Sequence, residues 1–90
     1  MSVPSPTQPA TQVLAMLRRG QSARIAAVDA ADGLPRRVAM LGLRRGVQLQ
    51  VVLGPDARGA VVRVGAARIA LGRDIVERIA VTPLSDVQAR

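Results

Sequence analysis

The sequence predicts a small, mainly β protein: a closed or nearly closed barrel of about five short strands, with one inserted short helix and a helical turn before the last strand. The chain has 90 residues, which suffices for one core. Hydrophobic residues make up 49% of it, yet none is Phe, Tyr or Trp, so small and branched side chains must fill that core. Short apolar runs of period two, separated by glycine-rich turns, favour antiparallel strands.

The first third of the chain predicts a lead-in, a turn and a strand. Residues 1–10 are rich in proline and predict a disordered N-terminal extension. Thr11 is expected to cap a short helical turn through Leu14 and Leu17. Residues 23–28 then alternate as a strand does, with Ala23, Ile25 and Ala27 on one face.

The inserted helix is predicted by a change of period. Leu34, Val38 and Leu41 follow the i, i+4, i+7 spacing of one helix face, so all three are expected in the core. Pro35 is tolerated in the first turn, where its missing N–H would have no helical partner. Gly42 is expected to end the helix in a left-handed conformation.

The second half of the chain predicts the remaining strands of a single domain, residues 11–83. Turns are predicted at residues 54–59, which are rich in Gly, Pro and Asp, and at residues 65–66, which begin with a glycine. Residues 84–90 are expected to form a C-terminal tail. The expected elements are strands at residues 47–53, 60–64, 67–71 and 79–83, with a helical turn at residues 75–78.

The composition excludes several kinds of chemistry. The chain has no cysteine and no histidine, which removes thiolate sites, cysteine nucleophiles and the usual general base. All 13 basic residues are arginine, which stays protonated and cannot shuttle protons. We therefore expect no enzyme and no small-molecule substrate. The net charge of +7 favours an acidic partner.

No apolar run reaches the length of about 20 residues that a membrane-spanning helix needs, because arginines interrupt each run. The N-terminal residues also lack the basic and apolar regions of a signal peptide. A cytoplasmic location is the expectation.

Three parts of the sequence resemble the FeoA family across about residues 13–82. They are Leu14-x-x-Leu17-x-x-Gly20-x-x-Ala23-x-Ile25; Arg37-x-x-x-Leu41-Gly42-Leu43-x-x-Gly46 with the strand after it; and Val62-x-Val64-Gly65 with Arg68-Ile69-Ala70-Leu71-Gly72-Arg73 and Ile79-x-Val81.

This resemblance implies an SH3-like β-barrel, a domain also found at the C-terminus of DtxR-like repressors. It further implies an accessory role in bacterial ferrous iron transport. The implied partner is FeoB, a membrane permease with a cytosolic GTP-binding domain, which would recruit the chain to the inner face of the membrane.

The candidate partner-binding residues lie on and just after the inserted helix. They combine an apolar centre, Met40 and Leu43, with a rim of arginines at Arg36, Arg37 and Arg44. Interfaces are enriched in methionine and arginine of this kind. This segment is therefore the expected contact surface for the partner.

For metal, only Asp74 and Glu77 have a spacing that could share one ion, and such a pair would bind Fe²⁺ or Zn²⁺ weakly or adventitiously. No cofactor is expected. RNA is the alternative partner, because small basic barrels bind it, although the chain lacks the aromatic residues on which bases stack. Pairing of edge strands into a homo-oligomer stays open.

Overall fold

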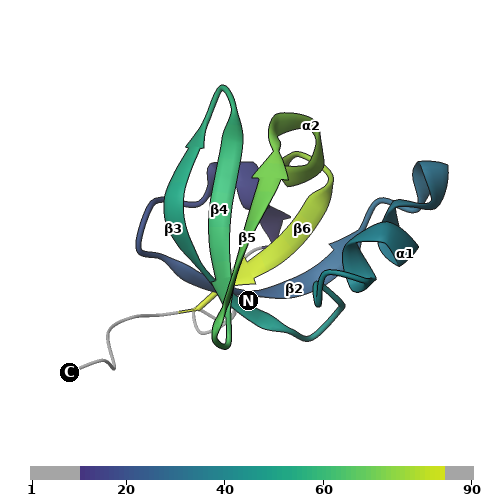
Figure 1. Cartoon of the computed structure of the whole chain (residues 1–90), viewed down its shortest axis with the longest axis horizontal. Helices are drawn as coiled ribbons and strands as arrows, with labels where there is room; N and C mark the ends of the chain where they lie inside the picture. The colour runs from purple at the N-terminus through teal and green to yellow at the C-terminus, as the bar shows by residue number, and fades with distance from the viewer. Residues whose placement is uncertain (1–10, 85–90) are drawn as a thin grey trace, which may run out of the picture.

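Six antiparallel strands form one curved sheet in the computed structural model, which describes residues 11–84 (Figure 1). The sheet order is β1-β6-β2-β3-β4-β5. The strands are β1 (Gln12–Val13), β2 (Ser22–Val28), β3 (Gln48–Asp56), β4 (Gly59–Val64), β5 (Ala67–Gly72) and β6 (Ile79–Pro83). The helical elements are η1 (Leu14–Met16), η2 (Ala31–Gly33), α1 (Leu34–Ala39) and α2 (Arg73–Val76).

This architecture confirms the mainly β fold with an inserted helix and a helical turn before the last strand. The expected N-terminal extension, residues 1–10, lies outside the described residues, as do residues 85–90 of the tail expected at residues 84–90. Leu84, the first residue of that tail, donates its N–H to the carbonyl oxygen of Ser22 at 2.9 Å. Within residues 11–84, no helix is long and apolar enough to cross a membrane.

The sheet curves because its long strands change neighbours along their length. The start of β3, Gln48 to Gln50, pairs with β2, and β3 pairs with β4 from Gln50 onward, so Gln50 alone has both neighbours. Likewise, β2 pairs with β3 through Ser22–Arg24 and with β6 along most of its length. A register shift between Ile25 and Ala27 marks a bulge in β2. The bulge interrupts the alternation predicted for residues 23–28, so Ala23 and Ile25 are buried but Ala27 is exposed.

The concave side of the sheet holds a single apolar core. No polar or charged residue is buried among residues 11–84. The core side chains are Leu14, Leu17, Ala23, Ile25, Leu34, Val38, Leu43, Leu49, Val51, Ala60, Val62, Ile69, Leu71, Val76, Ile79 and Val81. Leucine, valine and isoleucine supply most of this volume, as the composition predicted.

The N-terminal segment differs from its prediction. Thr11 caps no helix: a short strand, β1, comes first, and the single 3₁₀ turn of η1 begins after Val13 without a side-chain cap. Leu17 is already extended. The spacing of Leu14 and Leu17 is also the three-residue period of a 3₁₀ turn, which places both side chains on the buried side.

Candidate docking face

Residues 29–46, nearly all of the segment between β2 and β3, stand out from the barrel and carry η2 and α1 (Figure 1). We call residues 29–46 the insertion. Leu34 and Val38 lie four residues apart and are both buried, which confirms the predicted inner face of α1. Pro35 lies in the first turn of α1, as expected. The opposite face of the helix is left to solvent.

The insertion leaves α1 through a Schellman motif. Gly42 has φ of 95° and donates its N–H to the carbonyl oxygen of Ala39 at 2.9 Å. Leu43 donates to the carbonyl oxygen of Val38 at 3.0 Å. These two bonds and the left-handed residue define the motif, in which the residue after the glycine packs back against the helix.

Two sequence predictions are therefore wrong, and for the same reason. Leu41 was expected in the core but is 50% exposed, because the helical period ends before it. Leu43 was expected at the partner surface but is fully buried, because the reversal at Gly42 turns it inward. Leu43 cannot form the apolar centre of an interface, and Leu41 is the apolar side chain left outside.

The other candidate contact residues are all exposed. Arg36 and Arg37 lie on α1, Met40 follows it and is 81% exposed, and Arg44 lies just beyond the reversal. Residues three or four positions apart on a helix are neighbours, so Met40 lies beside Arg36 and Arg37. We define the docking face as Arg36, Arg37, Met40, Leu41 and Arg44. It combines two exposed apolar side chains with three exposed arginines.

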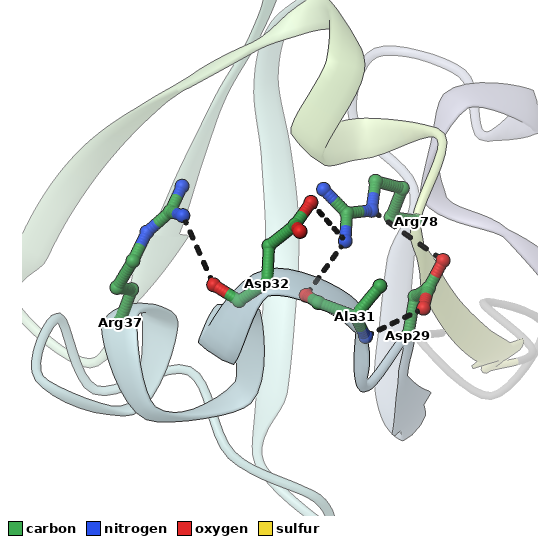
Figure 2. Close-up of polar contacts among 5 residues, drawn as sticks. All are labelled: Asp29, Ala31, Asp32, Arg37 and Arg78. Atoms are coloured by element: carbon green, nitrogen blue, oxygen red, sulfur yellow. Dashed lines mark hydrogen bonds and ion pairs between the residues drawn. The ribbon is translucent and has the colours of Figure 1, made fainter.

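The insertion is tied to the barrel by Arg78, from the loop between α2 and β6 (Figure 2). Its Nη2 donates to the carbonyl oxygen of Ala31 at 2.8 Å and lies 3.7 Å from Oδ2 of Asp32. Its Nε lies 3.4 Å from Oδ2 of Asp29. The backbone carbonyl of Arg78 also accepts the N–H of Asp29 at 2.9 Å. One residue thus fixes the start of the insertion through both its main chain and its side chain.

Asp29 forms the other half of this contact. Its Oδ1 accepts the N–H of Ala31 at 2.9 Å, an Asx turn that directs the chain into η2 (Figure 2). This backbone bond, together with the nearby Arg78 guanidinium, lowers the pKa of the Asp29 carboxyl below its ordinary value. Asp29 therefore stays ionised under physiological conditions and keeps both contacts.

Sequence reasoning missed Arg78 because nothing local indicates its role. Its ion-pair partner Asp29 lies 49 positions earlier in the chain. Only the pairing of β2 with β6 brings the two together.

The two candidate metal ligands do not form a well-prepared site. Oε2 of Glu77 lies 2.8 Å from Nε of Arg73, so an arginine already holds that carboxylate. Asp74 is exposed in the first turn of α2. Among residues 11–84, no three His, Cys, Asp or Glu side chains gather where they could hold an ion. Two monodentate carboxylates, one of them ion-paired, are a poor donor set for a divalent cation.

Both the sequence and the fold of the chain are similar to those of known proteins. The family model for the FeoA domain matches residues 12–83. No curated protein sequence matches the chain. The solution structure of the FeoA protein from Chlorobium tepidum is 29% identical, with a TM-score of 0.72, over 82% of this chain and 71% of that one.

Two further solved structures show the range of proteins that share this fold. A zinc complex of FeoA from Stenotrophomonas maltophilia, described as a prokaryotic SH3 domain protein, is 29% identical with a TM-score of 0.66, over 78% of this chain and 88% of that one. A manganese-dependent transcriptional repressor is 26% identical with a TM-score of 0.77. There the match covers 91% of this chain but 45% of the repressor, so the chain spans less than half of that protein.

Proposed function

Because the chain belongs to the FeoA family, we propose that it is a non-enzymatic accessory protein of bacterial ferrous iron transport. It docks on the cytosolic part of a FeoB-type permease and modulates that permease. The Stenotrophomonas relative, described as a candidate ferrous iron transport activating factor, supports the transport role. The observation that carries the docking role is the exposure of Met40 and Leu41 in a segment that also exposes Arg36, Arg37 and Arg44.

The composition of the docking face suits a protein partner. Methionine adapts its flexible side chain to an irregular partner surface, and arginine is enriched at interfaces. Met40 is 81% exposed and its neighbour Leu41 is half-exposed, so both leave apolar surface in contact with water. Binding a partner would remove this surface from water, which is favourable. Apolar contacts of this kind supply affinity, and the surrounding cations favour one orientation.

The insertion presents this face in a fixed position. Arg78 holds its start, and the Schellman motif with buried Leu43 holds its end. A surface that is already ordered loses less conformational entropy on binding. The docking face is therefore already ordered before a partner binds.

The charge of the chain indicates an acidic partner surface. Among residues 11–84, the ion-paired arginines are Arg73 and Arg78, so the arginines of the docking face carry no carboxylate partner. With a net charge of +7, the chain would be steered toward an acidic region of the permease. Binding there would bring this chain from the cytoplasm to the inner face of the membrane.

The test is titration calorimetry of the full chain against the cytosolic domain of the FeoB permease from the same organism. Met40→Asp buries a charge at the centre of the contact, and Arg37→Glu reverses one rim charge. Each should weaken binding by about tenfold or more, equivalent to about 1.4 kcal/mol. Met16→Asp is the matched control, because Met16 is 66% exposed but lies on η1, among α2, β3 and β6. If all three variants bind the permease domain with the same affinity, the permease contacts another surface of the chain.

A further inference from the structure

A groove of about 480 Å³ opens between β2 and the insertion, beside the docking face. Residues 26–28 of β2 line it from one side. Pro35, Arg44 and Arg45 line it from the insertion, and the fully buried Leu43 lies behind them in its wall. No carboxylate is among its lining residues. Small apolar surfaces and two cations therefore face one open volume.

The groove exists because the sheet opens at this point. The backbone pairing between β2 and the segment leading into β3 continues up to Ile25, which donates to the carbonyl oxygen of Val47 at 2.9 Å and accepts from Gly46 at 2.8 Å. Beyond this pair, no backbone bond among the described residues joins residues 26–28 to residues 43–45, and Leu43 donates instead to the carbonyl oxygen of Val38 in α1. Residues 26–28 thus have β6 as a neighbour on one side and, among the described strands, no neighbour on the other.

We propose that this groove binds an extended acidic peptide segment, which adds a short strand to the open edge of β2 and directs its carboxylates to Arg44 and Arg45. This goes beyond the proposed function, since it assigns a second site with its own ligand chemistry. Arg44 borders both sites, but the docking face does not need residues 26–28 or Arg45, and the groove does not need Met40.

The open strand edge favours an extended ligand. Unpaired backbone groups at a sheet edge serve as a template for another strand, and proteins use such edges to bind peptides. Residues 26–28 span about 10 Å at roughly 3.3 Å per residue, which allows pairing over about three positions. The volume of the groove is within the range of about 300–1,000 Å³ typical of ligand sites.

The lining of the groove favours acidic side chains that alternate with small apolar ones. Ala26, Ala27, Val28 and Pro35 offer shallow apolar contacts, which fit valine or alanine side chains. Arg44 and Arg45 are exposed, and among residues 11–84 neither forms an ion pair. Since side chains of a strand alternate between two faces, a ligand with carboxylates on one face and methyl groups on the other matches both features.

A nucleic acid fits this groove less well. Single-stranded RNA would need stacking partners, and the chain has no aromatic residue. A polyanion would contact the two arginines but leave the strand edge unpaired. The backbone contact therefore separates a peptide from a nonspecific anion in an experiment.

The test uses a capped eight-residue peptide that alternates glutamate and valine, titrated into the isotopically labelled full chain and followed by nuclear magnetic resonance. Amide signals of residues 26–28 and of Arg45 should shift and saturate. Arg45→Glu should weaken binding about tenfold, and Arg68→Glu, an exposed arginine on the far edge strand β5, should not. Met40→Asp should leave peptide binding intact, which separates this site from the docking face.

Three further peptides test the strand geometry. One has the same composition in block order, four glutamates and then four valines. The other two carry N-methyl groups on all valines or on all glutamates, which removes the backbone donors along one edge. We expect the block peptide and at least one methylated peptide to lose about tenfold or more in affinity. Equal binding by all four peptides would overturn the proposal and show a nonspecific anion site, as would shifts that avoid residues 26–28.

Discussion

Replacing Leu43 with alanine tests how the insertion is anchored. Leu43 is fully buried, and it reaches the core because Gly42 reverses the chain after α1. Leu41, two positions earlier in the same motif, is 50% exposed. The pair Leu43→Ala and Leu41→Ala therefore compares the same chemical change on the two sides of the reversal.

The expected difference in the free energy of unfolding is large. Truncating a fully buried leucine to alanine costs about 2–5 kcal/mol, since transfer and cavity terms add. For the half-exposed Leu41 we expect less than about 1 kcal/mol. A domain of this size has a total stability of roughly 4–11 kcal/mol, so Leu43→Ala removes a large share of it.

Urea denaturation followed by far-ultraviolet circular dichroism measures both variants. The chain has no Trp or Tyr, so intrinsic fluorescence offers no signal. With a urea dependence of about 1 kcal/mol per molar, Leu43→Ala should lower the midpoint by about 2 M or more, and Leu41→Ala by less than about 1 M. Equal losses, or a larger loss for Leu41→Ala, would refute the placement of Leu43 in the core.

Three further predictions concern the two ends of the insertion. Gly42→Ala should lower the free energy of unfolding by about 1 kcal/mol, because a φ of 95° is costly for a residue with a Cβ. The cost is conformational, since no neighbouring atom lies within 4 Å of where the Cβ would be. A lower urea midpoint for Gly42→Ala than for the wild type would show it. The lowered pKa of Asp29 adds stability that is complete above its unfolded value near 3.8 and is lost as the pH falls through the lower folded value. Midpoints measured between pH 5 and 2 should therefore fall more steeply for the wild type than for Asp29→Asn, and parallel curves would contradict this. Arg78→Ala should speed hydrogen exchange at the Ala31 amide, whereas Arg73→Ala, which removes an exposed ion pair on α2, should leave that amide protected.

Much of the fold could be predicted from the sequence because local patterns determine it. The spacing of Leu34 and Val38 predicted the buried face of α1, and Gly42 predicted where the chain leaves it. The error at Leu41 arose from extending the helical period past the last helical turn. A Schellman motif turns the residue after its glycine back toward the helix. The hydrophobic residue after Gly42, Leu43, was the signal in the sequence that could have predicted its burial.

The rest depends on contacts between distant segments. Arg78 meets Asp29 because β2 and β6 are neighbours, and no pattern near either residue indicates that pairing. The bulge after Ile25 likewise depends on how β6 lies against β2. The groove beside β2 follows from the divergence of the insertion, which is a feature of tertiary structure.

The most direct test of the account is a titration of the wild-type chain into the cytosolic domain of the FeoB permease from its own organism. The titration is run at low and at physiological salt. A structured RNA with the same net charge as the permease domain serves as the comparison. We expect saturable binding to the permease domain that persists at physiological salt, where binding to RNA fades. Tight binding to RNA without binding to the permease domain would contradict it and assign this basic barrel to nucleic-acid recognition.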